Sequence, residues 1–211
     1  MKIRYIIFFT GLVMLAGQTV AQQFEYADNN QVKTLLGGQV KVRGFGSVDL
    51  KVSQWNKQTT LLVGGHGGVI LNNQFTLGLG GYGITTRSKF KSSDNQDNLY
   101  LGGGYGGLLI GYSIFAREIF HVHFPILFGG GGIDVLEDED NIFSNGFDNI
   151  KDSTGFFILE PGVEIEINVA SFFRLAIGGT YRFIEGSDLN DISQSDLENW
   201  STHISFKFGK F

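Results

Sequence analysis

The sequence predicts an all-β chain that folds as an eight-stranded antiparallel up-and-down transmembrane β-barrel. Long segments alternate apolar with polar or small residues at period two, which is the signature of strands. These segments exceed the usual length of soluble strands, about 5–6 residues. Short turns alternate with long polar loops along the chain, and almost no segment after Gly38 has the periodicity of a helix.

The composition indicates a folded chain and excludes some partners. The 211 residues include 31 Gly, no Cys and 42% hydrophobic residues. That apolar content is too high for a disordered chain, and the glycines lack the G-X-Y period of collagen. The formal net charge of −5 does not attract nucleic acid, so we predict no nucleic-acid partner.

The N-terminal residues have the pattern of a secretory signal. Lys2 and Arg4 precede the apolar stretch Tyr5–Gly17, which is shorter than the roughly 18 residues of a spanning helix. No Cys follows this stretch, so a lipid-anchored lipoprotein is excluded. The predicted parts are a signal peptide at 1–21, a periplasmic N-terminal segment at 22–38 and the barrel at 39–211. The sequence leaves open whether residues 22–38 enter the barrel mouth.

The eight predicted strands share the period-two alternation, and the segment Phe173–Phe183 shows it most clearly. Leu175 and Ile177 lie on the face opposite Arg174 and Arg182. The expected strands are 39–52, 59–72, 75–87, 98–114, 119–133, 155–169, 172–185 and 200–211. Each is long enough to cross a bilayer, which takes about 9–11 residues in a tilted strand.

The connections between these strands alternate in length. Short turns are expected at 72–74, 115–118 and 170–171, and long polar loops at 88–97, 134–154 and 186–199, with a modest connection at 53–58. Short turns at one end and long loops at the other are typical of outer-membrane barrels. In hydrocarbon, only a closed ladder of strands leaves no backbone group unpaired. The pattern therefore predicts a multi-pass barrel in the outer membrane, in contact with outer-membrane lipid.

Several strand phrases resemble known barrels. The chain as a whole is similar to the small eight-stranded outer-membrane β-barrels of Gram-negative bacteria. Leu62–Gly68, Tyr100–Gly107 and Val122–Ile126 resemble a glycine-rich barrel family common in Bacteroidota, which has no assigned activity. The resemblance implies that the barrel-assembly machinery inserts the chain through its C-terminal strand.

One feature of the last strand departs from this pattern. Phe206 and Phe208 lie on the expected lipid face, whereas Phe211 is out of phase with them. We therefore expect a bulge or a short tail at Gly209.

Charged and histidine side chains lie on the faces expected to point into the lumen. An eight-stranded barrel is just wide enough for its side chains to fill it. Our hypothesis is that these groups pair across the lumen and plug it. The predicted network consists of Lys41, Arg43, His66, His121, His123, Glu160, Glu164, Glu166, Arg174, Arg182, His203 and Lys207.

Some of the same residues form a weak candidate for a metal site. His121 and His123 lie two apart on one strand, and the next strand brings Glu164 to about the same height. Imidazole and carboxylate groups are ligands for zinc and other transition metals. Arg174 starts the following strand at that level and competes for the glutamates, which favours a lumen ion-pair network instead. We therefore predict neither a bound metal nor a cofactor.

Two glycine-rich segments match the G-x-G-x-x-G pattern of dinucleotide sites. They are Gly78–Gly83 and Gly102–Gly107, and both lie inside expected strands with no helix after them. Because the motif needs a helix directly after it, we interpret these glycines as allowing sharp barrel curvature and close approach of backbones.

An enzyme is the main alternative to a structural barrel. Barrels that act on lipid need a nucleophile, a histidine and an acid at the membrane surface. No histidine is expected to face lipid, and His203 shares the lumen face with Ser201 and Ser205. The acidic segment 134–152 could bind Ca²⁺, but it lacks the EF-hand spacing, which favours a solvated loop with an unknown extracellular partner.

We therefore predict a non-enzymatic barrel with a structural or surface-contact role in the cell envelope. The alternative is a binder of a small ligand or a narrow conduit through the lumen. A cavity lined by His66, Tyr82, Glu160 and Arg182 would favour that alternative, whereas a closely packed lumen would favour the structural role.

Overall fold

The computed structural model describes residues 40–86, 88–91, 98–136, 150–188 and 192–211. The predicted signal peptide, the segment 22–38 and most of the acidic segment 134–152 lie outside these residues. In the part of the chain that is described, no helix is long and apolar enough to span a membrane.

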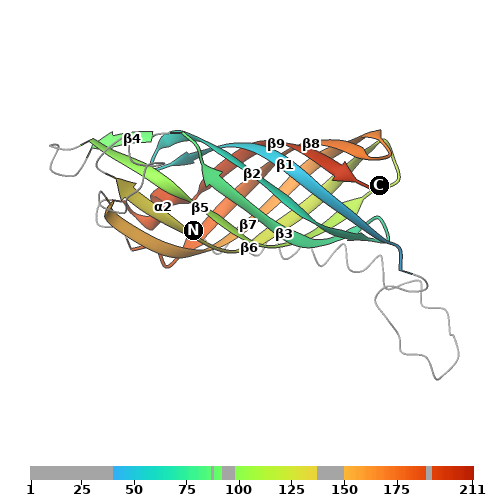
Figure 1. The fold of residues 1–211 in the computed structure, drawn as a ribbon, viewed down its shortest axis with the longest axis horizontal. Helices are drawn as coiled ribbons and strands as arrows, with labels where there is room; N and C mark the ends of the chain where they lie inside the picture. Colours follow the sequence, from blue (N-terminus) through green and yellow to red (C-terminus); the bar gives the residue numbers. More distant parts are fainter. Residues whose placement is uncertain (1–39, 87, 92–97, 137–149, 189–191) are drawn as a thin grey trace, which may run out of the picture. The chain divides into compact units, whose positions relative to one another are not determined.

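The described residues confirm the all-β fold and the eight long strands (Figure 1). The third predicted strand ends early, because β3 stops at Ile84 and the short β4 pairs separately with β5. The elements are β1 (Val42–Trp55), β2 (Gln58–Leu71), β3 (Phe75–Ile84), β4 (Ser88–Lys91), β5 (Asn98–Ile114), β6 (Phe120–Leu136), β7 (Ile150–Ala170), β8 (Phe173–Glu185), α2 (Gln194–Leu197) and β9 (Asn199–Gly209).

The strands form one closed antiparallel sheet. Their order is β3-β2-β1-β9-β8-β7-β6-β5-β4, and a further pairing of β3 with β5 closes the barrel. The strands cross the barrel at a tilt, which closure requires (Figure 1). We call the end with the β2–β3, β5–β6 and β7–β8 turns and Phe211 the turn end, and the opposite end, which holds α2, the loop end.

Two hairpin turns explain how neighbouring strands keep their register. Asn56 and Lys57 join β1 to β2, and Asn72, Asn73 and Gln74 join β2 to β3. The φ angles are positive at Asn56, Lys57, Asn72 and Asn73: 47°, 61°, 51° and 67°. Two consecutive positive φ angles make the type I′ turn whose twist matches that of paired strands, and asparagine adopts them more readily than most residues.

Glycine makes room for large lumen side chains at specific positions. A Cβ on Gly64 would overlap the ring of Tyr82, which lies beside it on β3. Gly103 has a φ of +134°, which a residue with a side chain rarely adopts. These glycines therefore act within strands, as the absence of a following helix predicts.

The outward face of the barrel wall is apolar over most of its height. Leu79 of β3 is 67% exposed. Phe157 is 69% and Ile165 58% exposed, and both lie on β7, whose alternate side chains are buried in the lumen. Such extensive apolar exposure is unusual on a water-soluble monomer and marks an interaction surface.

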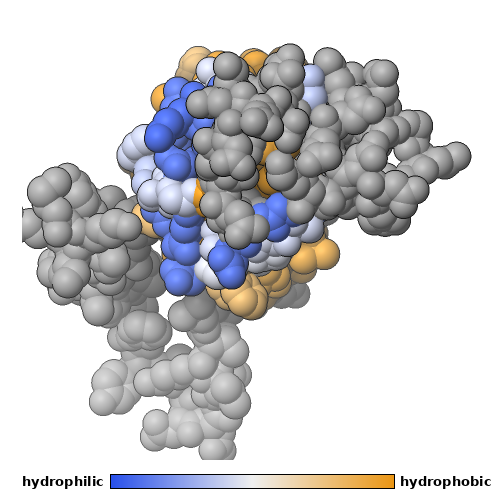
Figure 2. All heavy atoms as spheres, turned by 90° about the vertical axis from the view of Figure 1, so that its left-hand side faces the viewer, coloured by the Kyte–Doolittle hydropathy of each residue, from blue (hydrophilic) through white to orange (hydrophobic). Residues whose placement is uncertain are grey.

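The polarity of the wall reverses near the loop end. There the inward side chains form an apolar core with Trp55, Leu62, Leu99, Leu101, Ile133, Ile158 and Ile184, closed by Ile192 and Leu197 of the α2 segment. The outward side chains at the same strand ends are polar and exposed, among them Gln54, Thr59, Thr85, Ser153 and Glu185. Figure 2 looks onto this end and shows hydrophilic side chains gathered there. This reversal was not predicted from the sequence.

Candidate functional site in the barrel lumen

Strand β7 carries three acidic residues that point into the lumen. Its alternation turns Glu160, Glu164 and Glu166 inward while Leu159, Val163 and Ile165 are exposed outside. The three glutamates are at most 4% exposed. Buried charge is costly unless it is paired, so each carboxylate needs cationic or hydrogen-bonding partners from other strands.

Lys207 of β9 joins two of these glutamates. Its Nζ lies 2.5 Å from Glu164 Oε2 and 2.6 Å from Glu166 Oε1. Without this ammonium group, two buried carboxylates would lie side by side on β7. Lys207 is itself only 3% exposed, so the three residues form one compensated buried cluster.

Two histidines and an arginine complete the shells of the same two glutamates. His203 Nε2 lies 2.9 Å from Glu164 Oε1, and His121 Nε2 lies 2.6 Å from Glu166 Oε2. Arg174 Nη1 lies 3.3 Å from the same oxygen of Glu166. His121 stands directly opposite Glu166 in the β6–β7 ladder, so strand register accounts for this contact.

A second group surrounds Glu160 in the middle of the lumen. Lys51 Nζ lies 2.9 Å from Glu160 Oε1, and Thr180 Oγ1 donates a hydrogen bond of 2.5 Å to the same oxygen. The ammonium of Lys51 also lies 3.7 Å from the centre of the Tyr82 ring and 3.3 Å from Tyr105 Oη. A cation over an aromatic face gains electrostatic attraction, so these rings help to hold the buried charge.

A third group joins β1, β2 and β3 around Asp49. Tyr82 donates a hydrogen bond of 2.9 Å to Asp49 Oδ2, and His66 Nδ1 lies 2.7 Å from that oxygen. Ser47 Oγ lies 2.8 Å from the same ring nitrogen of His66. In a catalytic triad the nucleophile and the acid contact different nitrogens of the imidazole, so this arrangement does not form one.

Arg182 connects the polar lumen with the loop end. It is fully buried and donates hydrogen bonds to the carbonyl oxygens of Leu197, at 2.9 Å, and Gln54, at 3.0 Å. Its guanidinium lies 3.9 Å from the centre of the Trp55 ring. Arg182 thus connects α2 to the end of β1. The sequence predicted only that it would pair with other side chains in the lumen.

Two predicted members of the network differ from the others. Lys41 precedes β1 and is exposed, because the alternation of β1 begins only at Val42. Arg43 is half-buried and makes no ion pair within the residues that the structure describes. The other ten predicted residues all lie buried in the lumen.

The geometry alters the candidate metal ligands. His123, Glu164 and Glu166 have potential ligand atoms within 4.8 Å of one another, whereas His121 is not part of this set. Lys207 already places a cationic group between the two carboxylates. A divalent ion there would compete with that ammonium and with Arg174, so the cluster is better suited to internal ion pairs.

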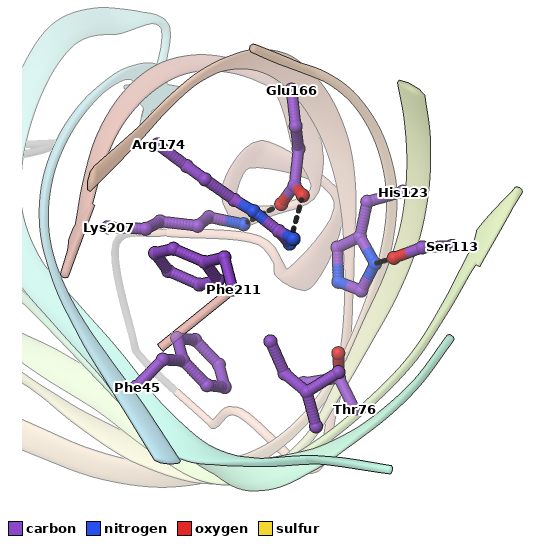
Figure 3. A pocket seen from close by; sticks show the side chains of 9 residues that line it. Phe45, Thr76, Ser113, His123, Glu166, Arg174, Lys207 and Phe211 are labelled. Carbon is purple, nitrogen blue, oxygen red and sulfur yellow. Dashed lines mark hydrogen bonds and ion pairs between the residues drawn. The ribbon is translucent and has the colours of Figure 1, made fainter. Parts of the chain in front are cut away.

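A small cavity lies beside this cluster, near the turn end. It has a volume of about 10 Å³, which is about the space that one water molecule needs. Figure 3 shows His123, hydrogen-bonded to Ser113, and Arg174 and Lys207 pointing towards Glu166. A binder would be favoured by a cavity lined by His66, Tyr82, Glu160 and Arg182, and none of these four residues lines this cavity. Tyr82 and Arg182 instead pack against charged and aromatic partners.

Phe211 closes the side of this cavity. Strand β9 ends at Gly209, as the out-of-phase Phe211 predicts, and a short tail follows. Phe211 N donates a hydrogen bond of 3.1 Å to Ser171 O, and its ring centre lies 4.0 Å from Arg174 Cζ. Figure 3 shows the ring next to that of Phe45.

Two aromatic partners of the network, Trp55 and Tyr105, were not predicted from the sequence. Trp55 lies beyond the predicted end of the first strand, although it continues the inward phase of Lys51 and Ser53. Extending that alternation by three residues would have found it. Tyr105 was hidden within a run of glycines, where the two faces cannot be told apart.

The closed ladder of strands defines an eight-stranded antiparallel β-barrel of the kind seen in outer-membrane proteins. Neisserial surface protein A aligns with a TM-score of 0.50 and 11% identity, over 82% of this chain and 100% of its own. The N-terminal β-barrel domain of Pseudomonas aeruginosa OprF has a TM-score of 0.46 and 10% identity, over 80% and 99%. The attachment invasion locus protein of Yersinia pestis has a TM-score of 0.43 and 14% identity, over 81% and 98%.

At these identities the comparison shows the fold alone. Of the three structures, only Neisserial surface protein A, with a TM-score of 0.50, supports that conclusion. No protein-family model and no curated protein matches the chain. The resemblance to a glycine-rich Bacteroidota family therefore stays a prediction.

Proposed function

We propose that this chain is an integral outer-membrane protein with a structural or surface-contact role, and that its plugged lumen carries no wide aqueous pore. The observation that carries the proposal is the polarity of the wall. Apolar side chains are exposed outside the barrel while charged side chains are buried and paired inside it. A soluble barrel has the opposite arrangement, whereas a barrel in lipid requires this one.

We call the apolar part of the outer wall, which includes Leu79, Phe157 and Ile165, the apolar belt. Aromatic residues near both ends of this belt support a bilayer around it. Towards the turn end, Phe173 and Phe208 stack with ring centres 5.1 Å apart. Towards the loop end, Tyr181 contacts Phe183 and Trp200, with ring centres 4.6 Å and 5.0 Å away. Aromatic rings gather at membrane–water interfaces because they are apolar with a polar edge. The belt would then be the part in contact with hydrocarbon.

Two features of the lumen support a plugged barrel. The ion-pair clusters around Glu160 and Glu166 fill the section within the belt. Above them, the apolar core with Trp55 and Leu197 closes the loop end. A hydrated ion would have to separate several buried ion pairs and then cross an apolar plug. The same packing argues against the narrow conduit that the sequence left as an alternative.

Export and assembly complete the proposal. Residues 1–21 would direct export, and the barrel-assembly machinery would insert the chain through β9, whose outward side chains include Phe208, 50% exposed. A non-enzymatic role is supported by the lumen histidines: His66, His121, His123 and His203 are all buried, away from the lipid-facing wall.

Fractionation and gel migration test the proposed location. The protein is expected in outer-membrane fractions, where unheated samples should migrate differently from boiled ones because a closed barrel resists detergent. A soluble fraction, or migration unchanged by boiling, would contradict the membrane barrel.

Planar-bilayer recordings test the plug separately. We expect no stable conductance of porin size from the purified protein. Stable openings of that size would show that the ion pairs do not close the lumen, and would leave the membrane location intact.

A further inference from the structure

The turn end of the barrel combines exposed aromatic and basic side chains. Phe115 is 70% exposed, Phe120 64% and Phe172 63%. Phe115 and Phe172 lie in the turns, beyond the strands. Rings in this position suit the headgroup level of a bilayer better than its hydrocarbon. We call these residues, with the basic residues Lys41, Arg117 and Lys210, the turn-end rim.

The basic residues are placed directly beside apolar ones. Arg117 lies in the same turn as Phe115 and Ile119, and Ile119 is 65% exposed. Lys41 precedes the exposed Val42, and Lys210 follows β9. All three basic residues are exposed. Long basic side chains in such places extend along the apolar surface and hold their charge at the level of lipid phosphates.

Backbone hydrogen bonds hold the rim in shape. In the β5–β6 turn, Glu118 N donates a hydrogen bond of 2.8 Å to Phe115 O, and Asn168 N donates one of 2.9 Å to Ile119 O. On the other side of the barrel, Lys41 N donates to Asn72 Oδ1 at 3.0 Å, and Lys210 N donates to Gly44 O at 3.3 Å. The backbone that carries these basic residues is thus held in place before any lipid binds.

The two ends of the barrel carry opposite charge. Of the exposed side chains that the structure describes at the turn end, only Glu118 is acidic. At the loop end, acidic residues outside the lumen outnumber basic ones among the residues that the structure describes. Lys57, Lys89, Lys91 and Lys151 lie there together with Asp134, Asp152, Glu185, Asp188, Asp196 and Glu198. An anionic headgroup is therefore favoured more at the turn end than at the loop end.

We propose that the turn-end rim binds the phosphate groups of anionic phospholipids in the adjacent leaflet. The inference rests on the proposed membrane location and adds the class of lipid and the end that binds it. Arginine and lysine form charge-assisted hydrogen bonds with phosphate, and an anionic surface attracts each basic residue near it. The aromatic rings of the rim anchor the barrel at the depth where these contacts form.

Electron paramagnetic resonance with spin-labelled lipids tests the proposal. The full protein is folded into phosphatidylcholine vesicles that contain traces of acyl-chain-labelled phosphatidylglycerol or phosphatidylcholine, and the motionally restricted fraction is compared. A lipid beside one basic residue should gain about fivefold in association. Averaged over the whole shell, we expect at least about a twofold preference for phosphatidylglycerol, which should fall with added salt.

Matched variants locate the preference. Arg117→Gln should lower it, and the triple variant Lys41→Gln, Arg117→Gln, Lys210→Gln should bring it close to unity. Lys57→Gln removes an exposed charge at the loop end and should leave it unchanged. The lipid inference would be overturned if the wild type associated equally with both lipids, or if the triple variant kept the preference of the wild type for phosphatidylglycerol. Neither result would contradict the membrane location. A spectrum without any restricted lipid would overturn the membrane location as well.

Discussion

The two sections of the lumen are built by the same strands but hold opposite kinds of side chain. Towards the turn end, Glu164, Glu166 and Lys207 are buried as ion pairs. Towards the loop end, Trp55 and Ile184 belong to an apolar core. The outward face changes in the opposite sense. It carries exposed apolar side chains such as Ile165 over most of its height, and exposed polar side chains such as Gln54 and Glu185 at the loop end.

The difference fits the proposed membrane location, in which the chemistry inside the wall matches the environment outside it. If the apolar part of the wall faces hydrocarbon, its outward side chains gain nothing from leaving water, and buried polar pairing has to specify the lumen. If the loop-end part faces water, burial of apolar surface stabilises the barrel there as it does a soluble core. The loop-end section would then act as a rigid support for the loops outside the membrane.

Removing Lys207 should have the largest effect on the turn-end section. Lys207→Met leaves two buried carboxylates without their shared cation, and breaking a buried pair costs about 3–5 kcal/mol. Urea titration of the protein folded in vesicles, followed by gel migration, measures the loss. The double variant Lys207→Met, Glu164→Gln should recover part of it. A single variant as stable as the wild type would show that the ion pairs do not specify this section.

Truncating Trp55 tests the loop-end section in the same assay. Trp55→Ala removes a fully buried ring that packs on Tyr105 and Arg182, and we expect a loss of about 3 kcal/mol. Trp200→Ala is the control, because Trp200 is 70% exposed on the outer wall and should cost much less. Equal losses would mean that the loop-end core contributes no more than the outer wall.

Arginine substitutions on the outer wall should show where the lipid contact ends. Leu79 is 67% exposed in the middle of β3, and Leu79→Arg should cost about 2–4 kcal/mol in vesicles because a charge then faces hydrocarbon. Gln54→Arg at the loop end should change the free energy of unfolding by no more than about 0.5 kcal/mol, as a substitution at an ordinary exposed position does. Similar costs at both positions would remove the boundary between the two sections.

The smallest effect is expected where α2 meets the β1–β2 turn. Ser193 and Lys57 lower the pKa of the Asp196 carboxyl by hydrogen bonding and by ion pairing at 3.3 Å. A lowered carboxyl pKa stabilises the fold above its ordinary value of 3.8, and this contribution is lost as the pH falls through the lowered value. Lys57→Ala should reduce stability at neutral pH by less than about 1 kcal/mol, measured by urea titration. The difference from the wild type should disappear in acid, and a difference that persists there would rule out the carboxylate as its source.

The alternation of Phe173–Phe183 and of the other long segments was enough to predict eight strands and the faces they bury, because a strand reverses its side chains at every residue. It also placed Glu160, Glu164 and Glu166 in the lumen. Strand ends were less well predicted, since residues such as Trp55 near a turn are no longer flanked by a repeating pattern.

Which lumen groups meet was decided only by the tertiary structure. Lys207 reaches Glu164 and Glu166 past the intervening strand β8, from a strand that is not adjacent to β7. Such contacts depend on barrel closure, strand tilt and side-chain length, none of which period-two alternation encodes. The apolar core of the loop end likewise needs Leu197 from α2 to meet Trp55 from β1. The sequence by itself determined the barrel and its two faces through local periodicity, and long-range closure determined the partners within it.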